Sequence, residues 1–131
     1  MTDLLDVNVL VALTSRDHIH HETARQWFAA TTAPFATCPL TELGLVRISV
    51  QLGSTLATAL SALRSITEHI AHARWPDDID VDDLTLRGVT GHRQVTDAYL
   101  AALARHHDGQ LVTFDRAIGA LHPDVAVVIP T

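Results

Sequence analysis

The chain has 131 residues, a net charge of -6 and no lysine, so all nine of its basic residues are arginines. The absence of lysine excludes a P-loop nucleotide site and Schiff-base catalysis, both of which use a lysine amine. The negative charge argues at first against a nucleic-acid partner, because phosphate binding normally needs a basic surface. The length and the 47% hydrophobic content predict one ordered domain over residues 1–131.

Three features predict a protein of the reducing cytoplasm with no membrane association. The single cysteine, Cys38, has no partner for an internal disulfide. The N-terminus has no basic segment ahead of an apolar one, as a signal peptide would have. The longest apolar run, residues 98–104, is far shorter than the roughly 20 residues that span a bilayer.

Strands and helices are predicted to alternate from the start of the chain. Residues 3–7 form a short apolar stretch between acids, which is typical of a buried parallel strand. Asn8 is a candidate cap for a helix that follows directly. A second helix is predicted over residues 18–30, where Trp27 and Phe28 are expected to pack on its buried face.

A strand and two longer helices are predicted next. Residues 35–38 form a short apolar strand that Pro39 ends. Thr41 is the candidate cap of the following helix, which carries Glu42 in its first turn. Apolar residues spaced by three or four then predict a long helix over residues 54–73.

The second half begins with an acidic run and then resumes the alternation. Five of the seven residues 77–83 are aspartates, which predicts a solvated surface loop rather than a metal site. The pattern beyond it predicts a helix over 95–105, a strand over 111–114, a short helix over 115–121 and a strand over 125–129. Strands alternating with helices imply an α/β fold with a central parallel sheet.

Four acidic side chains are predicted to gather at one edge of that sheet. Asp6 and Asp115 each follow a predicted strand, and Glu42 opens a helix after another strand. Asp97 lies near the start of an alanine-rich helix. Ligands of parallel sheets bind beyond the carboxyl ends of the strands, and clustered carboxylates repel one another unless a cation such as Mg²⁺ joins them. The spacing alone leaves open that each acid only caps a helix.

The residues around these acids resemble the PIN-domain family and, within it, the VapC-type toxins of bacterial toxin–antitoxin pairs. The resemblance covers most of the chain. Each motif is weak alone, but the four occur in the family's order: LLDVNVL at 4–10, TELG at 41–44, VTDAYLAALA at 95–104 and LVTFD at 111–115.

The resemblance implies a three-layer α/β/α domain and a metal-dependent endoribonuclease, the toxin of a type II pair. Its catalytic and metal-binding acids would be Asp6, Glu42, Asp97 and Asp115. The ion would be Mg²⁺, with Mn²⁺ expected to substitute. Asn8 and Thr113 match polar positions that orient the acids. No further acid follows Asp115 closely, as it does in some relatives, which favours one ion over two.

The resemblance also implies partners. It predicts a VapB-type antitoxin that covers the acidic site, a structured RNA substrate such as tRNA or ribosomal RNA, and a homodimer. Candidate RNA contacts are Arg93 and Arg116, which lie close in sequence to site acids. When the four site acids and the five aspartates of 77–83 are set aside, the rest of the chain has six acids and nine arginines. The net charge therefore no longer argues against RNA.

Other functions remain as alternatives. The chain could be a non-catalytic PIN-like module that binds RNA or protein, or a PIN nuclease of RNA processing rather than a toxin. An aspartyl-phosphate receiver domain is disfavoured because it needs a lysine, and a dinucleotide site because there is no G-x-G-x-x-G. The nine histidines show no zinc-ligand spacing, which predicts no histidine metal site.

Overall fold

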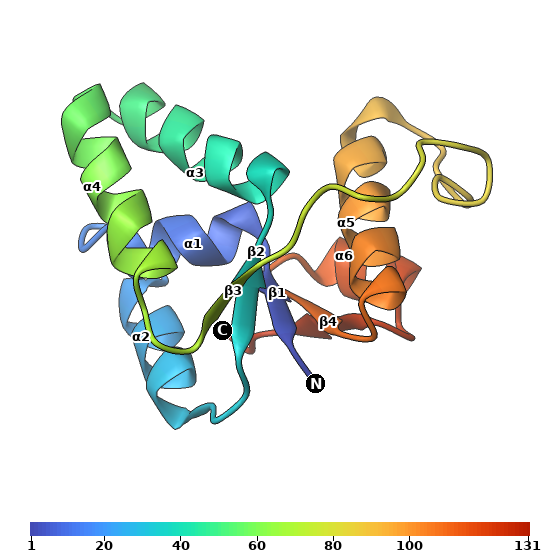
Figure 1. Cartoon of the computed structure of the whole chain (residues 1–131), viewed down its shortest axis with the longest axis horizontal. Helices are drawn as coiled ribbons and strands as arrows, with labels where there is room; N and C mark the ends of the chain where they lie inside the picture. Colours follow the sequence, from blue (N-terminus) through green and yellow to red (C-terminus); the bar gives the residue numbers. More distant parts are fainter.

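A computed structural model describes residues 1–131 and shows a sheet of five parallel strands with helices on both of its faces (Figure 1). The strand order is β3-β2-β1-β4-β5. The strands are β1 (Asp3–Leu5), β2 (Phe35–Thr37), β3 (His72–Arg74), β4 (Gln110–Thr113) and β5 (Ala126–Val128). This arrangement confirms the predicted α/β/α fold with a central parallel sheet.

The helices divide into two layers. The first four lie on one side of the sheet and the last two on the other (Figure 1). They are α1 (Val7–Thr14), α2 (His21–Ala30), α3 (Pro39–Gln51), α4 (Leu56–Thr67), α5 (Val95–His106) and α6 (Arg116–Leu121), with a 3-10 turn η1 (His92–Gln94) ahead of α5. None of these helices has the length and apolar character needed to cross a bilayer.

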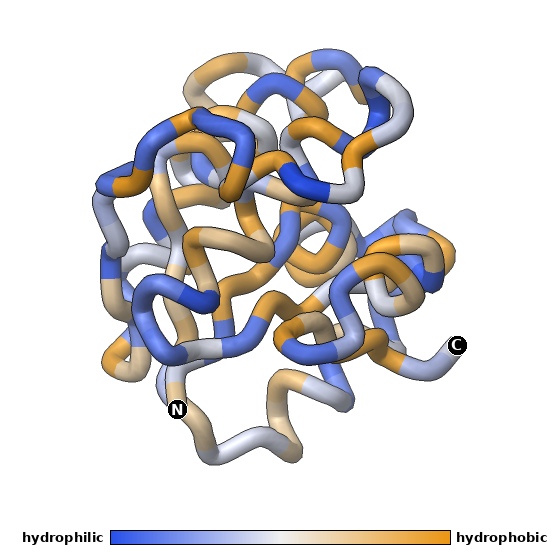
Figure 2. The backbone as a smooth tube through the Cα atoms, turned by 90° about the vertical axis from the view of Figure 1, so that its right-hand side faces the viewer, coloured by the Kyte–Doolittle hydropathy of each residue, from blue (hydrophilic) through white to orange (hydrophobic).

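The strands alternate their side chains between two hydrophobic clusters, one for each face. Leu4 packs with Leu100 and Leu103 of α5, whereas its neighbour Leu5 packs with Val9 and Leu10 of α1. This alternation is the period of two expected of a strand that is covered on both faces. Along the helices, hydrophobic stretches alternate with hydrophilic ones, as amphipathic covering helices require (Figure 2).

The start of α1 differs from the prediction. The strand stops at Leu5, and Asp6 rather than Asn8 caps the helix, because its carboxylate accepts a hydrogen bond from the backbone N–H of Val7. Asn8 lies inside the first turn, where its amide is free to bond elsewhere. The helix predicted over 18–30 begins only at His21.

The prediction of a helix over residues 54–73 is wrong at both ends. It runs only over Leu56–Thr67, capped by Thr55, and the following chain forms the edge strand β3. Thr41 does not cap α3 either. Cys38 is the cap residue, and the Thr41 hydroxyl accepts a hydrogen bond from the backbone N–H of Cys38. Helix α3 therefore starts at Pro39, three residues earlier than a cap at Thr41 would give, and Glu42 lies in its first turn as predicted.

Parallel pairing places the ends of the three central strands together. Leu4 pairs with Ala36 of β2 on one side and with Leu111 of β4 on the other. The residues that follow these strands therefore lie at one edge of the sheet. Asp6 follows β1 directly, and Asp115 comes two residues after β4.

Gly109, in the turn before β4, allows a close approach that no other residue would permit. A Cβ atom there would overlap the backbone oxygen of Thr2 and lie 2.7 Å from the ring of Trp75. We expect Gly109→Ala to lower the free energy of unfolding by about 1–3 kcal/mol, as overpacking does. Gly91 is the control, because a Cβ there meets nothing within 4 Å. Urea denaturation should leave Gly91→Ala within about 0.5 kcal/mol of the wild type. An equal loss in the two variants would contradict this account.

Candidate active site

Asp6 is a buried carboxylate held by hydrogen bonds at both oxygens. Its side chain is at the end of β1 and is only 6% exposed. Oδ1 accepts a hydrogen bond from the backbone N–H of Val7 at 2.8 Å, and Oδ2 accepts one from the Thr113 hydroxyl at 2.8 Å. Burial nevertheless raises the pKa of Asp6, and the nearby charge of Asp115 raises it further. The ionised form is thus fixed in place but poorly solvated.

Asp97 extends this acidic cluster from the other side of the sheet. It lies in the first turn of α5 and is half-buried. Burial, followed by the charges of Asp6 and Asp115, raises the pKa of Asp97 to about 6. The three carboxylates are therefore close enough to repel one another, although they come from α5 and from the ends of two different strands.

The hydroxyl of Thr113, at the end of β4, links the Asp6 carboxylate to the backbone of Asp115. Because this hydroxyl donates its one proton to Asp6, its lone pairs accept the other hydrogen bonds. The amide of Asn8 donates to it at 3.1 Å, and the backbone N–H of Asp115 donates to it at 3.0 Å. The Asn8 oxygen in turn accepts from the backbone N–H of Phe114. Asn8 and Thr113 thus hold the backbone and side chains around the acids.

Glu42 takes part in a neighbouring network. Its Oε2 accepts a hydrogen bond from the Thr37 hydroxyl at 2.7 Å and lies 3.5 Å from Nε of Arg74. The Thr37 hydroxyl is also 2.7 Å from Nε2 of His72. Since the hydroxyl proton points to the carboxylate, Nε2 of His72 must be the donor of that second bond. Thr37 is fully buried, so a fixed chain runs from His72 through Thr37 to Glu42.

Three of the four expected acids therefore lie close enough to interact electrostatically. Asp6, Asp97 and Asp115 influence one another electrostatically, whereas Glu42 is set by its own partners on β2 and β3. Thr37, His72 and Arg74 are not predicted as site residues from the sequence. His72 falls within the helix predicted over 54–73 and Arg74 directly follows that helix, so nothing in the sequence indicates that they lie beside the end of β2.

A cleft of about 610 Å³ opens beside two of the acids. Asp6 and Asp97 line it, together with Arg47 of α3 and apolar residues of α3 and α5. Arg47 is exposed and offers the cleft a cationic donor. Arg93 and Arg116 do not line the cleft; Arg93 lies on η1 and Arg116 starts α6, and both are exposed. Their predicted role in RNA binding stays a prediction.

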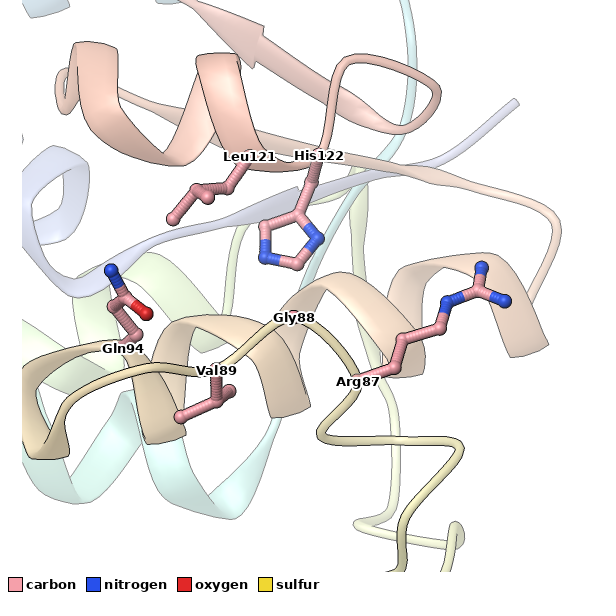
Figure 3. Close-up of a pocket in the computed structure, with 6 residues that line it drawn as sticks. All are labelled: Arg87, Gly88, Val89, Gln94, Leu121 and His122. Atoms are coloured by element: carbon pink, nitrogen blue, oxygen red, sulfur yellow. The ribbon is translucent and has the colours of Figure 1, made fainter.

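A smaller pocket lies between the segment before η1 and the end of α6 (Figure 3). The His122 ring points toward Gly88 there, and Nδ1 of His122 is 3.1 Å from Nη2 of Arg105. Because a guanidinium only donates, that nitrogen is an acceptor, and burial together with Arg105 lowers the pKa of His122. No carboxylate lines the pocket, so it offers no alternative to the acidic cluster as a site for Mg²⁺.

The donor chemistry of the acidic cluster fits a hard divalent cation. Three carboxylates supply only oxygen ligands, which Mg²⁺ and Mn²⁺ prefer. Burial and then the charges of Asp6 and Asp115 raise the pKa of Asp97, and no cationic side chain of the site lowers it. A cation would offset this repulsion, so the residues present suit a metal site.

Sequence comparison identifies relatives along the whole chain. A profile of the PIN domain matches residues 4–121. The chain is 50% identical over 131 residues to the protein named ribonuclease VapC29 of Mycobacterium tuberculosis, covering 100% of this chain and 98% of the relative. It is 45% identical over 127 residues to ribonuclease VapC39 of the same species, covering 90% of this chain and 91% of the relative.

Solved structures with the same fold are more distant in sequence. Mycobacterium tuberculosis VapC20, described as a toxin that cleaves the sarcin–ricin loop, superposes with a TM-score of 0.78 at 16% identity, covering 98% of this chain and 99% of that chain. A chain of VapBC2 from Rickettsia felis, bound to a fragment of its promoter DNA, gives 0.67 at 14% identity, covering 99% and 100%. These likenesses bear on the fold alone. The match to the PIN-domain profile and the full-length relatives identify the family: the chain belongs to the PIN-domain family and, within it, to the VapC proteins.

Proposed function

We propose that this protein is a metal-dependent endoribonuclease, the toxin of a type II toxin–antitoxin pair. The observation that carries the proposal is the cluster of Asp6, Asp97 and Asp115 beside an open cleft, in a chain half-identical to a protein named as a ribonuclease. A phosphodiester is itself anionic, so a cluster of carboxylates acts on it only with a cation between them. The proposed substrate is a structured RNA such as tRNA or ribosomal RNA.

In this proposal the acids hold Mg²⁺, with Mn²⁺ able to replace it. Asp6, Asp97 and Asp115 are the central ligands, and Glu42 acts directly or through a water. A bound divalent ion polarises the phosphodiester and lowers the pKa of a water for in-line attack. Asn8 and Thr113 keep Asp6 in one orientation, which pre-organises the site. Arg47 is placed to contact a phosphate entering the cleft.

We further propose a VapB-type antitoxin and a homodimer as the protein partners. The cleft combines carboxylates with exposed Leu43, so it suits a basic and partly apolar segment of an antitoxin. Leu52, at the C-terminal end of α3, and Leu56, the first residue of α4, are 67% and 59% exposed. Val50 of α3 and Leu60 of α4 are exposed as well, and a group of exposed apolar side chains, unlike a single one, supports a protein–protein contact there.

Asp97→Asn should separate catalysis from stability. Loss of one ligand charge is expected to lower RNA cleavage by about 10²–10³-fold, since a metal site supplies several kcal/mol of charge stabilisation. The folded-state pKa of Asp97 is about 6, above its ordinary 3.8, so ionisation of Asp97 weakens the fold as the pH rises through that window. Removing the charge should therefore raise the free energy of unfolding in EDTA at pH 7.5, by on the order of 1 kcal/mol for this half-buried group.

Asp83→Asn, on the exposed acidic loop, is the matched control and should change neither RNA cleavage nor the free energy of unfolding. Cleavage of purified RNA and thermal denaturation measure the two effects. Wild-type cleavage by Asp97→Asn would refute the assignment of the site.

Metal binding should weaken in acid. A proton competes with Mg²⁺ for Asp97, whose pKa is about 6 without metal, so the apparent affinity should be near its maximum above pH 7. It should fall about tenfold by pH 5, where about a tenth of the side chain is ionised. Calorimetric titration with Mg²⁺ at several pH values measures this. An affinity that stays constant between pH 5 and pH 7.5 would rule out Asp97 as a titrating ligand.

Thr37 should act as a positioning residue for Glu42. Thr37→Val removes the hydroxyl that holds Glu42 and leaves the N–H of His72 without its partner. We expect Mg²⁺ affinity and RNA cleavage to fall about 10–100-fold, as losses of such outer contacts do. Thr37→Ser keeps the hydroxyl and should restore both. Unchanged metal affinity in a folded Thr37→Val protein would show that Glu42 does not act at the metal.

A further inference from the structure

A second group of potential metal ligands lies at the C-terminal end of α5. It consists of Asp78, from the acidic run, and the adjacent His106 and His107. Nε2 of His107 is 3.0 Å from Oδ1 of Asp78, and Nε2 of His106 is 3.7 Å from Oδ2. One ligand atom from each of the three residues lies within 4.8 Å of the other two. The run of aspartates predicts a solvated loop here, and the spacing of the histidines predicts no metal site, because residues 78 and 106 are far apart along the chain.

The geometry of this group is set by packing. The imidazole of His107 stacks on the indole of Trp75, with ring centroids 4.4 Å apart and planes 14° apart. Trp75 is buried and directly follows β3, so it holds the His107 ring against the sheet layer. The hydrogen bond from His107 lowers the pKa of Asp78, which keeps the carboxylate ionised. Two of the three ligands are therefore oriented before any ion arrives.

We propose that Asp78, His106 and His107 form a zinc site, with water as the fourth ligand. Two imidazole nitrogens and one carboxylate oxygen suit Zn²⁺, whereas Mg²⁺ selects oxygen ligands. Zinc bonds of about 2.0–2.1 Å in a tetrahedron put neighbouring ligand atoms about 3.3 Å apart. The 3.0 and 3.7 Å separations run from the two oxygens of Asp78 to His107 and His106 and lie near that value, so the site needs only small rotations of Asp78 and His106, which are exposed.

This site is separate from the acidic cluster. Asp97 lies in the first turn of α5 and His106 is its last residue, nine positions further on. At 1.5 Å per residue, the two ends are about 14 Å apart along the helix axis. The inference therefore does not depend on the proposed nuclease site, and it concerns an ion of different chemistry.

Zinc here would fasten an otherwise irregular segment. Residues 75–91 form no helix or strand and run from β3 across to the α5 side of the sheet (Figure 1). Part of this segment, Ile79 and Leu86, forms a groove with Leu40 and Tyr99. Binding of an ion by Asp78 and the end of α5 would tie this segment to the helix layer, beside the stack of Trp75 on His107.

Titration of the purified full-length protein with Zn²⁺ alone, in buffer with 5 mM Mg²⁺ absent and then present, tests the proposal. We expect binding of one zinc that Mg²⁺ does not displace and that raises the melting temperature. X-ray absorption at the zinc edge should show two imidazole ligands. Asp78→Asn, His106→Asn and His107→Asn should each weaken zinc binding at least about tenfold. His92→Asn, at an exposed histidine outside the group, should leave it unchanged.

Asp78→Asn is the decisive variant, because Asp78 is exposed and its loss should not disturb the fold. No zinc binding at 100 μM, or wild-type zinc affinity in Asp78→Asn and His107→Asn, would overturn the proposal and leave two ordinary histidine–aspartate ion pairs. Asp97→Asn must retain the zinc site. If that variant loses zinc instead, the ion occupies the acidic cluster, and the proposal is wrong while the metal assignment of that cluster stands.

Discussion

Mutual repulsion among Asp6, Asp97 and Asp115 is the constraint to which the rest of the structure responds. Carboxylates brought together without a cation oppose folding, so the remainder of the fold must hold them against that force. Fixed hydrogen bonds do this locally, because the Thr113 hydroxyl bonds to Asp6 while accepting from Asn8 and the backbone of Asp115. Every partner comes from the first or fourth strand region, so the cluster and the central pairing of the sheet stabilise one another.

The aliphatic core supplies the rest of the restraint. Leu4 and Leu5 send one side chain to each face and anchor the strand that precedes Asp6. On α5, the fully or almost fully buried residues that face the sheet include Ala98, Ala101 and Ala104. Small side chains let this helix approach the sheet closely, which is what brings Asp97 within electrostatic reach of Asp6. The low aromatic content of the chain is thus consistent with a site that depends on close helix–sheet packing.

Much of this organisation could be predicted from sequence, and the failures have a common physical origin. Asp6 and Asp115 follow short apolar strands, and the parallel topology places them at one edge, so local pattern was enough. Strand β3 was missed because its three residues, His72–Arg74, have no apolar alternation and extend a helical pattern. Only its pairing with β2 defines it, and pairing is a property of the folded chain. The His72–Thr37–Glu42 chain and the contact between Asp78 and His107 could not be predicted for the same reason, because they join segments that meet only in the folded chain.

The distribution of charge resolves the conflict between an acidic protein and a proposed RNA substrate. Three arginines are bound to carboxylates, in the pairs Arg25–Glu22, Arg74–Glu42 and Arg105–Asp124. Six have no carboxylate partner: Arg16, Arg47, Arg64, Arg87, Arg93 and Arg116. The acids are concentrated in the cluster that would bind a cation and in the run 77–83, where Asp78 already meets two histidines. Net charge describes the average over these regions, whereas a phosphate that entered the cleft would meet Arg47 and, once the proposed cation is bound, an acidic site whose negative charge is offset.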